Sequence, residues 1–169
     1  NTTVPNILGD VSSGVGKFIF RDAADFPLMT YAQLQLVKAE ALFIKGDAAK
    51  AYEAYIKGIY AHMNFVNKYI NTTNEKSITA VEIDNYIKGG EIPLSAADLT
   101  LADIMGQKYI VQWGWGGLEQ WCDLRKYHYN TEIFKQFIPL AGSQLTYNDY
   151  CYRVRPRYNS EYVWNASEL

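Results

Sequence analysis

The sequence predicts a mainly α-helical protein, in which tetratricopeptide-like helix pairs form an α-α superhelix scaffold and a loop-rich tail follows. Three observations support this prediction: apolar residues recur at helical spacing, threonine caps precede those stretches, and glycines follow them. The chain of 169 residues is long enough for one domain with its own core. Within it we expect an irregular lead-in over 1–27, a helical scaffold over 28–127 and the tail over 128–169.

The first helix pair is predicted between Thr30 and Val66. Thr30 and Gln33 form a capping-box pattern, and the apolar residues that follow recur at helical spacing: Leu34, Val37, Ala41 and Ile44. Gly46 ends this helix, because glycine tolerates the left-handed conformation. A second helix begins near Ala48, and its predicted inner face holds Ala51, Tyr55, Gly58, Ile59 and Met63. This alternation of small and large side chains matches the tetratricopeptide pattern.

Further helices are predicted after a polar loop. Thr79 and Glu82 form a second capping box, and the short helix that they begin stops at Gly89. Thr100 and Asp103 begin a long helix, which continues through Ile104, Lys108, Val111 and Trp113. A glycine-rich break over 114–117 separates it from a last helix, which ends near Tyr127 and contains Leu118, Trp121, Leu124 and Arg125.

Composition and charge exclude several kinds of function. The net charge is −2 and no basic stripe is present, which argues against a nucleic-acid partner. No apolar run reaches the roughly 20 residues that a membrane helix needs. His62 and His128 stand apart from other metal ligands, so we expect neither a metal site nor a cofactor. Cys122 and Cys151 are either inert thiols or a disulfide that ties the tail to the last helix.

Two motifs near the end of the chain point to a family. An E-x-W-x-D-x-R run is formed by Glu119, Trp121, Asp123 and Arg125. A second run near the end of the chain contains Arg155, Arg157, Tyr158, Glu161 and Asn165, with Asn159 where a proline is usual. Together with the preceding helix pair, these motifs resemble the C-terminal part of SusD/RagB-type proteins of Bacteroidetes, in the SusD-like group.

The resemblance implies a function that composition alone does not supply. It implies a surface-exposed lipoprotein of the outer membrane that captures a glycan, or a peptide, and passes it to a TonB-dependent transporter. Family members are longer and carry a signal peptide and a lipid-bearing cysteine, neither of which is present in this chain. We therefore expect the chain to be the C-terminal part of a single SusD-like domain, with the remaining N-terminal part as a partner and the main ligand site in that part.

Three tryptophans near the glycine-rich break are the first candidates for ligand contact, because sugars stack on aromatic faces. Trp113 and Trp121 fall at helical spacing among apolar neighbours, which predicts that they pack in the core. Trp115 lies between glycines on the break, and loops carry function more often than helix faces do. The sequence therefore predicts Trp115 as the ligand-binding residue of this chain.

A carboxylate pair also raises the question of an enzyme. Glu119 and Asp123 are four residues apart, and paired carboxylates perform glycoside hydrolysis. Arg125 is well placed in the sequence for an ion pair with them, which predicts a structural network and no catalytic residues. We expect no enzymatic activity. The alternative to nutrient binding is a helical-repeat scaffold that mediates protein–protein contact only.

Overall fold

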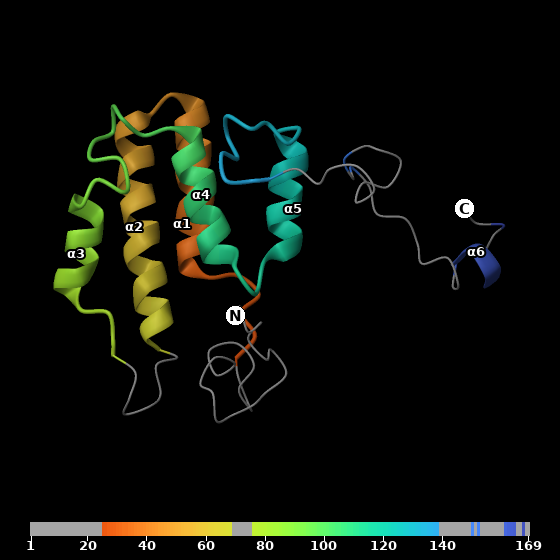
Figure 1. Cartoon of the computed structure of the whole chain (residues 1–169), viewed down its shortest axis with the longest axis horizontal. Coiled ribbons are helices and arrows are strands. Elements are labelled where there is room, and N and C mark those ends of the chain that lie inside the picture. Colours follow the sequence, from red (N-terminus) through yellow and green to blue (C-terminus); the bar gives the residue numbers. More distant parts are fainter. Residues whose placement is uncertain are drawn as a thin grey trace. The chain divides into compact units, whose positions relative to one another are not determined.

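The computed structural model of the chain describes residues 25–68, 76–138, 150, 152, 161–164 and 167 (Figure 1). The chain consists of two compact units, Asn1–Lys135 and Gln136–Leu169. The helices are α1 (Tyr31–Lys45), α2 (Ala48–Asn67), α3 (Ala80–Lys88), α4 (Leu101–Gln112) and α5 (Gly117–Lys126) in the first unit, and α6 (Glu161–Trp164) in the second. No described residue lies in a β-strand. The mainly α prediction is confirmed.

The predicted threonine caps all form. At Thr30, Thr79 and Thr100, the side chain accepts a hydrogen bond from the backbone N–H three residues further on. At the last two caps an acidic side chain returns a bond to the threonine backbone N–H and completes the capping box, from Glu82 and Asp103 respectively. These bonds satisfy N–H groups that have no partner inside the helix.

A Schellman turn joins α1 to α2. Gly46 has a φ of 88°, and its N–H donates to the Phe43 carbonyl at 3.0 Å. The N–H of Asp47 donates to the Leu42 carbonyl, also at 3.0 Å. Asp47 then caps α2 through its side chain, which accepts from the N–H of Lys50 at 3.3 Å. Asp47 thus completes the turn after α1 and caps the beginning of α2, as expected for a tight helix pair.

Small residues bring α1 and α2 close together. A Cβ atom at Gly58 would lie 2.9 Å from the Cγ of Leu36, which is fully buried. Ala39 and Ala51 are also fully buried, and Tyr55 is the largest side chain of this core. The predicted inner face of α2 is therefore confirmed at Ala51, Tyr55, Gly58 and Ile59.

The apolar series predicted on α1 does not mark the buried side of that helix. Leu34, Val37 and Ile44 are exposed. The buried residues of α1 are instead a mixture of small and polar side chains with one leucine: Ala32, Gln35, Leu36, Ala39 and Glu40. This side packs against both α2 and α4. Close packing of one helix between two others favours small side chains, which hydrophobic periodicity does not weigh.

Helix α4 completes the packing of the first unit. Its residues Ile104, Met105 and Val111 are buried, and the helix packs against α1, α2 and α5. In Figure 1, α3 flanks α2 on the side away from α4. Among the helices described, none combines the length and the apolar character that crossing a membrane requires.

Candidate functional site

A glycine-rich corner joins α4 to α5. α4 ends at Gln112, whose carbonyl accepts from the N–H groups of Trp115 at 3.1 Å and Gly116 at 2.7 Å. Gly114 has a φ of 82°, a conformation that side chains with a Cβ atom rarely adopt. A Cβ at Gly116 would lie 3.0 Å from both Cβ and Cγ of Gln112, which is buried. The glycines are therefore required to turn the chain here, and the turn sets the directions of the adjacent tryptophans.

Trp113 lies on the surface, and the prediction that it packs in the core is wrong. Its side chain is 61% exposed. With φ −57° and ψ 127°, Trp113 has already left the helix that ends at Gln112. Spacing of three or four residues places side chains on one face only while the chain remains helical. The helical spacing of apolar residues in the sequence therefore continues to Trp113, one residue beyond the end of α4.

Trp115 lies on the glycine-rich corner with its side chain partly buried. Its ring meets the ring of Phe26 edge to face, with centroids 5.6 Å apart and an interplanar angle of 85°. The Nε1 atom of Trp115 is buried and has no hydrogen-bond partner among the described residues. Trp115 is partly exposed overall. Its predicted place on the glycine-rich break is confirmed, and its predicted role in ligand binding stays a prediction.

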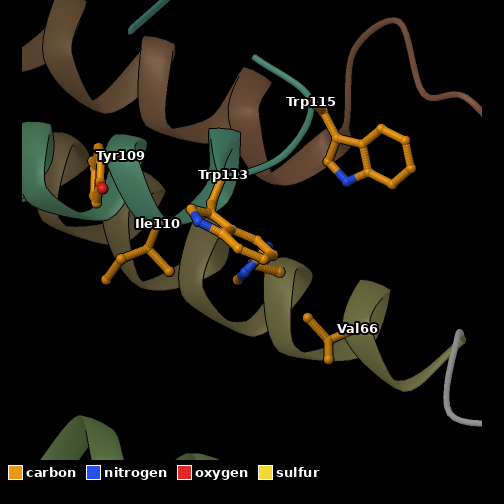
Figure 2. A pocket seen from close by; sticks show the side chains of 6 residues that line it. Val66, Tyr109, Ile110, Trp113 and Trp115 are labelled. Carbon is orange, nitrogen blue, oxygen red and sulfur yellow. The ribbon is translucent and has the colours of Figure 1, made fainter. Parts of the chain in front are cut away.

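The two tryptophans border a shallow aromatic hollow. This hollow has a volume of about 250 Å³ and is lined by His62, Val66, Tyr109, Ile110, Trp113 and Trp115. Figure 2 shows Trp113 between Ile110 and Trp115, over the ribbon that carries Val66. Tyr109 and Ile110 are exposed, as Trp113 is. The C-terminal ends of α2 and α4 thus present aromatic and apolar side chains to the surface at one place.

The polar side chain from α2 in this hollow is His62. Its ring stacks on that of Phe65, with centroids 6.5 Å apart and an interplanar angle of 19°. Burial lowers the pKa of His62 below its ordinary value, because a charged imidazolium is disfavoured away from water. At neutral pH the hollow therefore contains a neutral imidazole, with one nitrogen that donates and one that accepts.

A buried charge network connects three helices. The ammonium group of Lys108 on α4 contacts Glu40 of α1 at 2.9 Å and Asp123 of α5 at 2.7 Å. Glu40 also contacts Lys126 at 2.6 Å and accepts from the Tyr127 hydroxyl at 2.5 Å. Burial alone would raise the pKa of Glu40, but hydrogen bonds from Lys126, Tyr127 and Lys108 lower it to about 2. Burial raises the pKa of Asp123, against the opposing effect of Lys108.

The E-x-W-x-D-x-R run is divided between this network and the surface. Asp123 is buried against Lys108, so the predicted structural ion pair exists, but the partner is not Arg125. The Arg125 guanidinium lies 4.5 Å from the centroid of the Trp121 ring. Trp121 is half-buried and donates from Nε1 to the Tyr129 hydroxyl at 3.0 Å. Glu119 is exposed, so the two carboxylates of the run do not share a cleft.

Other predicted residues lie outside the described part of the chain. Arg157 and Cys151 are among them, and Glu161 begins α6, of which the side chain is not described. Cys122 is exposed on α5 and forms no disulfide with another described residue. The disulfide with Cys151 and the late arginine-rich run stay predictions.

Comparison with known proteins identifies a family. A model of a SusD-like family, described as starch-binding and associating with the outer membrane, matches residues 8–137. The chain belongs to this SusD-like family. The late motif around Arg157 lies beyond the matched residues. No curated protein matches this SusD-like chain, and no solved structure does.

Sequence reasoning missed several residues of the hollow and of the network. His62, Tyr109 and Ile110 carry no motif, because the hollow forms only when the ends of α2 and α4 meet. Glu40 could have been found: it lies four residues after Leu36 and directly after Ala39, on the side that small residues identify as buried. A charged residue on such a side predicts a buried partner.

Proposed function

We propose that this SusD-like chain binds a glycan at the aromatic hollow and does not hydrolyse it. The observation that carries the proposal is the exposure of Trp113 beside Tyr109 and Ile110. A large aromatic side chain on the surface leaves apolar area in water, and a patch of such side chains is typical of a binding site. The family is described as starch-binding, so an α-glucan is the first ligand to consider.

The dimensions of the hollow support binding of part of a glycan chain. Its volume of about 250 Å³ is below the roughly 300–1,000 Å³ of sites that enclose a drug-sized ligand. The hollow would therefore hold a sugar ring against Trp113 while neighbouring sugars extend into solvent. Aromatic faces offer contact to the C–H groups of a pyranose, as they do to other apolar groups. Trp115 would close the inner side of the hollow.

The test is the affinity of the full chain for maltoheptaose, measured by isothermal titration calorimetry. We expect Trp113→Ala to weaken binding about tenfold or more, corresponding to about 1.4 kcal/mol. The matched control is Trp164→Ala, because Trp164 is an 83% exposed tryptophan of α6 and is not among the residues that line the hollow. Equal affinity of wild type and Trp113→Ala would contradict the proposal, as would failure of the wild type to bind maltoheptaose.

We infer further that the bound glycan is passed to a TonB-dependent transporter of the outer membrane. Association of the family with the outer membrane supports this step. Surface exposure and a lipid anchor belong to the same proposal. Co-purification of the full-length protein with a transporter from solubilised outer membranes tests it, and recovery of the protein without any transporter would count against it.

The second candidate function is a scaffold for protein–protein contact only. The exposed apolar series on α1 favours it, since Leu34, Val37 and Ile44 offer a surface to another helix. The two functions differ in their response to Trp113→Ala. A pure scaffold would show no glycan affinity for the substitution to change.

A further inference from the structure

His62 is a polar group placed in an otherwise aromatic and apolar hollow. Its ring lies nearly parallel to that of Phe65, with centroids 6.5 Å apart, and this contact uses neither nitrogen. No hydrogen bond to the imidazole is formed within the described part of the chain. The side chain is partly exposed and lines the same hollow as Trp113 and Trp115. It is therefore oriented by the protein and still has both nitrogens available.

The charged groups around His62 leave it without an ionic partner. From α4, Tyr109 is the other titratable side chain in the hollow, and Lys108 is occupied by Glu40 and Asp123. Lys68 follows the last residue of α2 and lines a separate groove. From α3, Asp84 accepts from the Tyr60 hydroxyl. Burial is the cause of the lowered pKa of His62, so the imidazole is neutral at neutral pH.

We propose that His62 is the polar contact that orients the bound sugar, and that the hollow selects uncharged pyranoses. This inference rests on the proposed function. A neutral imidazole offers one donor and one acceptor, and a sugar hydroxyl can play either part. Trp113 supplies the apolar contact with the sugar face, and His62 fixes the rotation of the sugar on that face. Small-ligand sites generally combine an apolar lining with a few placed polar groups in this way.

The same arrangement disfavours an acidic glycan. A uronate would bring a carboxylate into an apolar hollow that holds no cation among the described residues. Removing a carboxylate from water without a partner is costly. We therefore expect oligogalacturonate of the same length to bind at least tenfold more weakly than maltoheptaose at neutral pH.

The affinity should also depend on pH. A sugar over His62 removes more water from the imidazole and lowers its pKa further in the complex. By linkage, affinity is complete above the pKa of the free protein and decreases as the pH falls below it, because protonation must then be reversed for the sugar to bind. The lowered pKa places this window on the acidic side of the ordinary value for histidine.

Calorimetry with maltoheptaose across this pH range tests the inference. His62→Phe keeps a ring for Phe65 and removes the polar contact, so we expect at least fivefold weaker binding and no dependence on pH. His62→Gln retains a donor and an acceptor without titrating, and should recover part of the affinity but not the pH dependence. Circular dichroism of each variant verifies the fold.

The outcomes separate this inference from the proposed function. If Trp113→Ala loses affinity but His62→Phe binds like the wild type with the same pH profile, the role of His62 is wrong and the hollow remains the site. Equal binding of oligogalacturonate would overturn the selection of uncharged sugars. If the wild type binds no maltoheptaose, the proposed function and this inference both fail.

Discussion

At the scale of single residues, Lys108 and Glu40 form an ion pair in which both side chains are buried. The Lys108 side chain is 4% exposed and contacts two carboxylates, so its charge is neutralised inside the helical unit. Glu40 is equally buried and receives three donors. Removing the Glu40 charge would leave these three donors without their charged acceptor, and hydrogen bonds to charged groups contribute about 1.5–3 kcal/mol each.

Glu40→Gln should therefore lower the free energy of unfolding by about 3 kcal/mol. The matched control is Glu53→Gln, since Glu53 and its partner Lys57 are both more than half exposed and surface pairs contribute about 0–1 kcal/mol. Urea denaturation monitored by circular dichroism measures both changes. Equal effects of the two substitutions would show that the network contributes no more than a surface ion pair.

The pH dependence of the free energy of unfolding tests Glu40→Gln in a second way. The pKa of Glu40 falls from an ordinary 4.5 to about 2 in the folded protein. Its contribution is complete above the higher value and is lost as the pH falls towards the lower one. In Glu40→Gln the loss of stability across this range should be smaller than in the wild type.

Residue-level prediction from the sequence succeeded where one helix determines the environment. The caps at Thr79 and Thr100 and the turn at Gly46 follow from local chemistry, and each is present. The ion-pair partner of Asp123 depends on how α4 meets α5, which no local pattern contains. The exposure of Trp113 depends on the one residue at which α4 ends, and helix boundaries are the least certain part of such predictions.

At the scale of elements, the glycines in the interiors of α2 and α4 have opposite surroundings. Gly58 of α2 faces the fully buried Leu36, with 2.9 Å between the added Cβ and the Leu36 Cγ. Gly106 of α4 has open space, with nothing within 4 Å of an added Cβ. Glycine lowers helix stability relative to alanine by roughly 0.5–1 kcal/mol, so it is retained at Gly58 because the helices approach closely there.

Alanine at these two positions should change stability in opposite directions. We expect Gly106→Ala to raise the free energy of unfolding by about 0.5–1 kcal/mol. Gly58→Ala should lower it by about 1–3 kcal/mol, because overpacking of the buried Leu36 outweighs the gain in helix propensity. The midpoints of urea unfolding decide. A stabilised Gly58→Ala protein would mean that α1 and α2 can separate without cost.

At the scale of the whole molecule, sequence and structure contribute different parts of the account. The order of helices and the SusD-like family follow from caps, periodicity and motifs. The aromatic hollow does not, since Val66 and Tyr109 come from different helices and have no signal of their own. The glycines on both sides of Trp115 predict that it lies on a turn. The helical spacing that predicts a buried Trp113 applies only as far as Gln112, where α4 ends.

We expect the glycan to bind at the aromatic hollow and at no other tryptophan-bearing surface. The chain has four tryptophans, so its nitrogen-15 correlation spectrum should contain an indole signal from each. On titration with maltoheptaose we expect saturable shifts of the Trp113 and Trp115 indole signals, and no shift for Trp121 and Trp164. Shifts confined to Trp121 or Trp164, or a spectrum that maltoheptaose leaves unchanged, would contradict the claim.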